Sequence, residues 1–290
     1  MKLINCKQIA TEIEDRIAEQ IYTLCTDPQA SQIKRRPTLA IIKVGQRADS
    51  DLYVKIKERQ ARSVGIETSL YLLPEKTDET ELLSVIKFLD QDDTVDGILV
   101  QLPLPSGLNT DLIIEQINPN KDVDGFHPEN LARLTDSEDA NRIIPPVYAG
   151  VLACLKQISF NLDAKSVLII GKSDIFTRNL DLMLESLGAQ VQVFKADEPW
   201  QAVSPKADLI ISAVGQAKLI GASQVKDGVV LIDVGVSQID GKSYGDVDAQ
   251  SLEQSEGYLT PVPGGIGPLT VALALRNTLD NYLKNLENNE

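Results

Sequence analysis

Short apolar runs recur along this chain, and each is followed by a stretch with helical periodicity. The clearest run, Pro37–Gly45, is rich in β-branched residues and closes on glycine, as a buried parallel strand does. Ser50–Gly65 and Asp78–Leu89 predict helices, and Thr68–Leu73 and Gly97–Gln101 predict further strands. This alternation predicts an α/β fold with a parallel sheet and helical crossovers.

A second series of the same kind begins near residue 145. Val147–Ile158 predicts a helix, Ser166–Gly171 a strand, and Ile175–Leu187 the next helix. Strand, glycine turn and helix in repetition are typical of a Rossmann-like dinucleotide-binding half-fold, although the full three-glycine fingerprint is absent. We therefore expect two α/β domains, one formed by residues 1–145 plus 271–290 and the other by residues 146–270. Further strands are predicted at Gln190–Phe194, Asp208–Ala213 and Val229–Asp233.

The 290 residues carry a formal net charge of −14. An acidic chain without a basic cluster argues against nucleic acid and anionic membranes as partners, so small-molecule ligands are expected. No apolar run reaches the ~18 residues of a membrane span, and the start does not resemble a signal peptide, which predicts a cytoplasmic protein. Cys6, Cys25 and Cys154 are too far apart for a disulfide framework or a zinc site, so no metal is expected.

Three polar residues are candidates for a site. Tyr53 and Lys57 are four apart, so on a helix a phenol and an amine share one face; a solvated surface helix is the alternative. Gln101 ends a predicted strand, where ligands of parallel sheets collect, and the prolines that follow fix its direction. A plain loop glutamine remains possible on this evidence.

Two loops have unusual composition. Lys121–Pro128 (KDVDGFHP) contains two Asp and a Gly, which suit an Asx-type turn or a carboxylate that binds a guanidine-like ring edge. The lone His127 is expected to be structural. Thr260–Thr270 contains three prolines and three glycines, so its backbone amides can approach a ligand closely, and a closing helix is expected after it.

Together these motifs resemble the bifunctional methylenetetrahydrofolate dehydrogenase/methenyltetrahydrofolate cyclohydrolase family. The matching segments run in the family's order across nearly the whole chain. They are Tyr53-x-x-x-Lys57, Val100–Pro105 (VQLPLP), Lys121–Pro128 (KDVDGFHP), Ile232–Gly235 (IDVG), Gly245–Val247 (GDV) and Pro261–Pro268 (PVPGGIGP).

The resemblance implies two α/β domains around a cleft, a folate-binding catalytic one and an NAD(P)-binding one. It implies oxidation of 5,10-methylene-tetrahydrofolate with NADP and hydrolysis of the methenyl product to 10-formyl-tetrahydrofolate, in a homodimer that binds tetrahydrofolate derivatives. By the same resemblance Lys57 is the catalytic amine, Tyr53 positions the folate ring, Gln101 tunes the lysine and Asp124 pairs with the pterin edge. The remaining implied site residues are Pro263, Gly264 and Gly265 for the substrate, and Gly171, Lys172, Ser173, Lys195, Asp197, Gly215 and Val236 for the cofactor.

The cofactor side departs from the family's pattern. Pro145–Gly150 (PPVYAG) replaces Pro-Cys-Thr-Pro-x-Gly, and Gly171–Asn179 (GKSDIFTRN) replaces Gly-Arg-Ser-x-x-Val-Gly-x-Pro. Thr177 therefore stands where glycine lets a helix start approach the pyrophosphate. After the next strand, Ala196 replaces the Ser expected to bind a 2′-phosphate, and Asp197-Glu198 adds negative charge.

Three interpretations of this divergence stay open. NADP could bind through altered contacts, with Lys172 and Lys195 compensating. The two acids could instead select NAD by accepting hydrogen bonds from its free ribose hydroxyls. A weakened cofactor site would leave a cyclohydrolase-only enzyme or a folate-binding regulatory paralogue.

Overall fold

The computed structural model describes residues 1–26, 35–136, 138–139 and 141–287, and the chain forms two compact units. Unit 1 contains Met1–Ala10, Leu134–Ala140 and Val147–Thr270, whereas unit 2 contains Thr11–Arg133, Asn141–Pro146 and Val271–Glu290. The predicted division differs from this one at residues 1–10, 134–140 and 146, each of which it placed with the other unit. The start of the chain belongs to unit 1 because β1 (Lys2–Leu3) pairs with β11 (Tyr258–Leu259).

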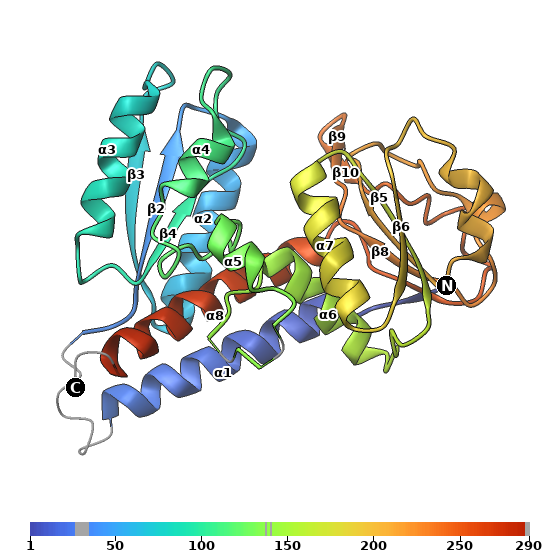
Figure 1. Ribbon diagram of the computed structural model, residues 1–290, viewed down its shortest axis with the longest axis horizontal. Coiled ribbons are helices and arrows are strands. Elements are labelled where there is room, and N and C mark those ends of the chain that lie inside the picture. The colour runs from blue at the N-terminus through green and yellow to red at the C-terminus, as the bar shows by residue number, and fades with distance from the viewer. Residues whose placement is uncertain (27–34, 137, 140, 288–290) are drawn as a thin grey trace. The chain divides into compact units, whose positions relative to one another are not determined.

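Unit 2 is built on a three-stranded parallel sheet with the strand order β3-β2-β4 (Figure 1). The predicted strands are confirmed as β2 (Thr38–Val44), β3 (Glu67–Leu73) and β4 (Gly97–Val100). Successive residues of the central strand β2 point to opposite faces, so this short apolar run contributes to two hydrophobic clusters.

Helices cover both faces of this sheet. Side chains of α1 (Cys6–Thr26), α2 (Ala48–Val64) and α8 (Ile266–Glu287) pack with Leu39 and Ile41 of β2 on one face. Side chains of α3 (Glu79–Asp90) and α4 (Thr110–Glu115) pack with β2 on the other. A short helix, α5 (Pro128–Ala132), follows the KDVDGFH segment.

Unit 1 contains a six-stranded parallel sheet with the order β1-β11-β8-β7-β5-β6. Its first strand in this part of the chain, β5, lies between β6 and β7, so the strand order reverses between β5 and β7. In doubly wound sheets such a switch point opens a crevice at the carboxyl ends of the strands, where ligands bind. The predicted elements are confirmed as α6 (Pro146–Gln157), β5 (Ser166–Gly171), α7 (Asp174–Ser186), β6 (Gln190–Phe194), β7 (Leu209–Ala213) and β8 (Val230–Asp233).

Several short elements were not predicted from the sequence. These are β1, β11, α5, a two-stranded hairpin of β9 (Ser237–Ile239) and β10 (Lys242–Tyr244), and three 3-10 turns at Trp200–Ala202, Ser204–Lys206 and Ala222–Gln224. Within the described part of the chain, no helix combines the length and the hydropathy needed to cross a bilayer.

Candidate active site

Lys57 and Gln101 are brought together in unit 2. Lys57 lies on α2, which begins shortly after β2, and Gln101 directly follows β4, the neighbour of β2. The Lys57 Nζ donates a hydrogen bond of 3.0 Å to the Gln101 Oε1. The Gln101 Nε2 donates to the Leu102 carbonyl at 2.7 Å, so the amide oxygen is the atom that faces the lysine.

Asp124 completes the electrostatic environment of the lysine. Burial lowers the pKa of Lys57, and the negative charge of Asp124 opposes this shift. Burial also raises the pKa of the Asp124 carboxyl, and the nearby Lys57 opposes that shift in turn. Both shifts make the neutral forms of amine and acid easier to reach than in water.

Tyr53 lies one helical turn before Lys57 on α2, and 43% of the residue's surface is exposed. Residues four apart share a face of a helix, so the phenol ring and the amine are available on the same side of α2. An exposed aromatic ring on the same helical face as a half-buried amine suits a flat ligand that stacks on the ring and reaches the amine.

The loop that carries Asp124 is held by its neighbour Asp122, which the sequence analysis overlooked. Asp122 is 1% exposed, and its carboxylate accepts hydrogen bonds from Gly125 N, His127 N and Asn130 Nδ2 at 3.0, 2.7 and 3.3 Å. Burial raises the pKa of Asp122 to about 6. The signal was the spacing Asp-x-Asp, in which one carboxylate can build the turn and the other can face a ligand.

Lys121 and His127 also have structural roles in this loop. The Lys121 Nζ donates to the carbonyls of Leu89, Asp90 and Asp92 and so satisfies the C-terminal end of α3. The His127 Nδ1 accepts from the Glu129 amide at the start of α5, and its Nε2 lies 3.1 Å from the Glu115 carbonyl oxygen. A structural histidine is what the sequence predicted.

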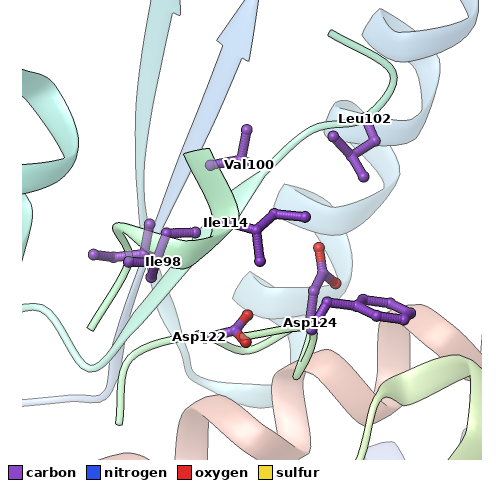
Figure 2. Close-up of a pocket in the computed structure, with 8 residues that line it drawn as sticks. Ile98, Val100, Leu102, Ile114, Asp122 and Asp124 are labelled. Carbon is purple, nitrogen blue, oxygen red and sulfur yellow. The ribbon is translucent and has the colours of Figure 1, made fainter. Parts of the chain in front are cut away.

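Figure 2 shows Asp124 in a small pocket of unit 2, with the carboxylate of Asp122 nearby. Apolar side chains from β4, the segment after it and α4 line the rest of the pocket (Figure 2). A carboxylate in a mostly apolar pocket suits recognition of a planar, hydrogen-bonding ring edge. The lining residues are Ile98, Val100, Leu102, Ile114, Ile117, Asp122, Asp124 and Phe126.

In unit 1 the predicted phosphate turn joins β5 to α7, at the switch point of the sheet. Gly171 ends β5, and the Ser173 side chain caps α7 by accepting from the Phe176 amide at 3.3 Å. The earlier amides of such a turn are those that a helix start offers to an anion. Lys172 and Ser173 are exposed beside them, so this turn fits a pyrophosphate.

Thr177, where the family pattern has glycine, is 5% exposed. Its hydroxyl donates to the Ser173 carbonyl at 3.2 Å, and its methyl faces Gly171: a Cβ added there would lie 2.5 Å from Thr177 Cγ2. The added bulk therefore fills the contact between helix and strand, and the surface of the turn where an anion would bind stays open.

Tyr148, in the altered PPVYAG segment, packs against the same turn. Its side chain is fully buried, its hydroxyl donates to the Phe176 carbonyl at 2.7 Å, and its ring meets the Phe176 ring edge-on at 5.4 Å between centroids. Burial raises the pKa of the Tyr148 hydroxyl. Tyr148 and Phe176, which both depart from the family pattern and lie in separate segments, therefore pack against each other.

After β6, Lys195, Asp197 and Glu198 are exposed, whereas Ala196 is partly buried against the core of unit 1. The Lys195 Nζ lies 3.4 Å from Asp174 Oδ1, in an exposed ion pair that contributes little stability. The Glu198 Oε2 accepts from the Lys195 amide at 2.7 Å, so this acid is engaged by its own turn. Asp197 remains exposed as the acid available to a ligand.

The remaining predicted residues also belong to unit 1. Gly215 follows β7, has φ +69°, and faces the Val236 carbonyl, 3.5 Å from where its Cβ would lie. In the proline- and glycine-rich loop, Gly264 has φ +94°, and a Cβ on Gly265 would lie 2.2 Å from the Pro261 carbonyl oxygen. Glycine is therefore required at these loop positions.

Two family models match the chain. The one described as "Tetrahydrofolate dehydrogenase/cyclohydrolase, catalytic domain" covers residues 4–124, and the one described as "Tetrahydrofolate dehydrogenase/cyclohydrolase, NAD(P)-binding domain" covers residues 145–286. Among curated proteins, the Bifunctional protein FolD of Sulfurihydrogenibium sp. (strain YO3AOP1) is 41% identical over 289 residues, covering 99% of both chains.

Solved structures agree with these matches. The FolD methylenetetrahydrofolate dehydrogenase/cyclohydrolase of Campylobacter jejuni has a TM-score of 0.90 at 38% identity and covers 100% of both chains. The FolD of Trypanosoma brucei, solved with NADP cofactor and an inhibitor, has a TM-score of 0.91 at 28% identity and covers 98% of both chains. This chain therefore belongs to the tetrahydrofolate dehydrogenase/cyclohydrolase family.

Proposed function

We propose that Lys57, tuned by Gln101 and Asp124, is the catalytic amine of a bifunctional methylenetetrahydrofolate dehydrogenase and methenyltetrahydrofolate cyclohydrolase. The hydrogen bond of 3.0 Å from Lys57 Nζ to Gln101 Oε1, in an environment that lowers the lysine's pKa, is the observation that carries this assignment. Tyr53 and Asp124 bind the folate, the first through its exposed ring and the second through the pterin edge.

The first reaction transfers a hydride from the methylene carbon of 5,10-methylene-tetrahydrofolate to the nicotinamide ring, which leaves the methenyl cation. The second adds water to that cation, opens the ring and releases a proton, giving 10-formyl-tetrahydrofolate. The electron-poor methenyl carbon needs a water from which a proton can be removed. A lysine whose pKa lies below its usual range has a larger neutral fraction at neutral pH and can accept that proton.

Gln101 and Asp124 act on this lysine in opposite directions. The Gln101 oxygen orients the amine, because its amide is fixed at the other end by the Leu102 carbonyl. Asp124 restrains the fall in the pKa of Lys57, so the amine can also donate a proton or a hydrogen bond to the folate. One lysine that exchanges protons in both directions can serve both reactions.

The hydride acceptor in this proposal is NADP, with NAD as the second candidate. The family's NAD(P)-binding domain and the NADP complex of the Trypanosoma brucei relative support a nicotinamide dinucleotide. Gly171, Lys172 and Ser173 would hold the pyrophosphate, Lys195 and Asp197 the adenosine end, and Gly215 and Val236 the remainder. Tyr148 and Phe176 pack against each other, so the altered turn is well packed. This favours a functional cofactor site with changed residues over a weakened one.

Pro263, Gly264 and Gly265 are assigned to substrate binding on the resemblance of their loop to the family's. Partners beyond tetrahydrofolate derivatives and the dinucleotide are not required by this chemistry.

A homodimer and a cytoplasmic location complete the proposal. The first is checked by light scattering of the purified protein, and a monomer at micromolar concentration would contradict it.

An absorbance assay tests the function directly. Formation of methenyl-tetrahydrofolate is followed with NADP and, separately, with NAD, and product with at least one of them is expected. No product with either would remove the dehydrogenase assignment. Hydrolysis of added methenyl-tetrahydrofolate without dinucleotide tests the cyclohydrolase independently. Calorimetric binding of folate without either turnover would instead identify a folate-binding paralogue.

A further inference from the structure

Asp246 is a fully buried carboxylate of unit 1 that none of the roles above uses. It lies between β10 and β11 in the sequence, in the GDV segment, yet its three hydrogen-bond donors come from the carboxyl end of β7 and the turn that follows it. The Asp246 Oδ2 accepts from Ser212 Oγ at 2.6 Å and from Val214 N at 2.7 Å. The Asp246 Oδ1 accepts from Gln216 N at 2.8 Å.

A second buried carboxylate holds Asp246 in place. Asp233, at the end of β8, is 2% exposed and accepts hydrogen bonds from the amides of Asp246 and Val247 at 3.1 and 2.8 Å. The Asp233 amide in turn donates to Thr260 Oγ1 at 2.7 Å. Asp233 therefore fixes the main chain that carries Asp246, and the Asp246 side chain fixes the segment Val214–Gln216.

Two glycines make this arrangement possible. A Cβ on Gly235 would lie 2.1 Å from Asp246 Oδ2, and a Cβ on Gly245 would lie 2.0 Å from Asp233 Oδ2. Each carboxylate lies directly against the backbone of a glycine in one of the family-like segments, IDVG and GDV. The two segments therefore form one structure, in which the Asp233 carboxylate binds the main chain that carries Asp246. We call Asp233 and Asp246 the interlocked carboxylates.

The segment that Asp246 holds lies at the switch point of the sheet, where doubly wound folds bind ligands. Val214–Gln216 follows β7, and Ala213, the last residue of β7, pairs with Gly171 at the end of β5. The bonds to Val214 and Gln216 leave Gly215, which is exposed with φ +69°, at the surface of the turn. Both carboxylate oxygens of Asp246 are satisfied by these three donors.

We propose that Asp246 is a positioning residue of the dinucleotide site, which fixes the Val214–Gln216 wall of the crevice in the conformation that receives NADP or NAD. The proposal rests on the proposed function, because it assigns a residue to the dinucleotide site of that enzyme. Asp246 touches neither substrate nor cofactor and acts only through this wall. Its loss should weaken dinucleotide binding and spare the hydrolysis, which needs no dinucleotide.

The test compares Asp246→Asn with the wild type. An asparagine keeps the shape but must turn its NH2 group towards one of the three donors, so the wall loses a hydrogen bond to a charged acceptor. We expect the calorimetric Kd for NADP or NAD, whichever the wild type binds more tightly, to rise about tenfold. The dehydrogenase KM for that dinucleotide should rise with it and kcat should change less than twofold. Cyclohydrolase activity should stay within twofold.

Asp208→Asn is the matched control. Asp208 stands next to the amino end of β7, and its carboxylate also accepts a backbone amide, that of Ser166, at 3.0 Å. This variant should keep the wild-type Kd for the dinucleotide. Ser212→Ala removes a single donor to Asp246 and should raise the Kd two- to threefold; it decides the question if Asp246→Asn does not fold.

Wild-type dinucleotide affinity in Asp246→Asn, or an equal loss of affinity in Asp208→Asn, would overturn the proposal. A fall in cyclohydrolase activity parallel to the loss of affinity would also overturn it, because it would indicate general damage. If the wild type binds neither NADP nor NAD, the dehydrogenase assignment fails and the role of Asp246 fails with it. A wild type that binds dinucleotide but lacks cyclohydrolase activity would contradict the role of Lys57 alone.

Discussion

The candidate sites of the two units are built by different means. In unit 2 the site consists of individual side-chain atoms: an amine, an amide oxygen and a carboxylate, each with a defined partner. In unit 1 it consists largely of backbone at a strand end, a helix start and tight turns, with side chains packed behind it. Chemistry depends on particular atoms, whereas backbone recognition tolerates new side chains that preserve the packing. Backbone recognition is therefore compatible with the changed side chains of the phosphate turn, whereas Tyr53, Lys57, Gln101 and Asp124 of unit 2 all match the family's pattern.

Substitution of Lys57 should produce the largest effect. Lys57→Ala removes the only amine that contacts Gln101 among the described residues, and we expect cyclohydrolase activity to fall at least ~100-fold, the usual contribution of a positioned base. Calorimetric affinity for the dinucleotide should be unchanged. Hydrolysis at the wild-type rate in a folded variant would contradict the catalytic role, and circular dichroism provides the check on folding.

Removal of Asp122 should damage unit 2 through its loop. Asp122→Ala leaves three donors without their acceptor, so we expect the free energy of unfolding to fall by about 1–3 kcal/mol. The KM for the folate should rise because Asp124 loses its support. Asp111→Ala, at an exposed acid on α4, is the control and should change neither quantity. A wild-type KM in Asp122→Ala would show that Asp124 is placed without this turn.

Cofactor preference should respond to smaller changes in unit 1. Ala196→Ser adds a hydroxyl at the position where the family binds a 2′-phosphate, and Asp197→Asn removes a negative charge beside it. One close charge pair contributes about 1 kcal/mol in water, and one added hydrogen bond contributes about the same, so each variant should raise the ratio of kcat/KM for NADP over NAD by about fivefold. An unchanged ratio in both would place the adenosine end elsewhere.

The interlocked carboxylates should give a pH-dependent difference in stability. Burial raises the pKa of Asp233 to about 7, so its contribution to stability is complete below the ordinary value of 3.8 and is lost as pH rises through about 7. Asparagine does not titrate. In urea unfolding, the wild type should therefore lose stability relative to Asp233→Asn between about pH 5 and about pH 8. An equal difference at both pH values would contradict the raised pKa.

Most of the regular elements were predictable because local pattern and tertiary context agree. The apolar run of β2 fits a strand that is buried on both faces, and the periodicity of α2 fits a helix that packs on one of those faces. The candidate residues Lys57 and Gln101 could be predicted because each comes shortly after a strand end. The two-residue strands β1 and β11 carry no such pattern, because they are defined by pairing across the chain rather than by their own residues. The pairing of β1 with β11 therefore could not be predicted from the start of the chain.

The supporting residues of the sites were harder to predict. Asp122 and Asp246 are buried carboxylates that bind mainly backbone amides. Every residue except proline has such an amide, so the sequence does not show which one a carboxylate will bind. The packing of Tyr148 against Phe176 joins positions 28 residues apart, so each change looked like a loss when considered alone. The hydrogen-bond and packing partners of a buried group can be identified only in the three-dimensional structure.

The exchange of chain ends between the units has a consequence for biosynthesis. Leu275 and Leu279 of α8 are buried in the core of unit 2, although the rest of that unit is made almost entirely from residues before 147. The ribosome must therefore translate all of unit 1 before the hydrophobic core of unit 2 can be completed. Until residues beyond Val271 leave the ribosome, the β2 face that α8 covers is exposed to chaperones and to neighbouring chains.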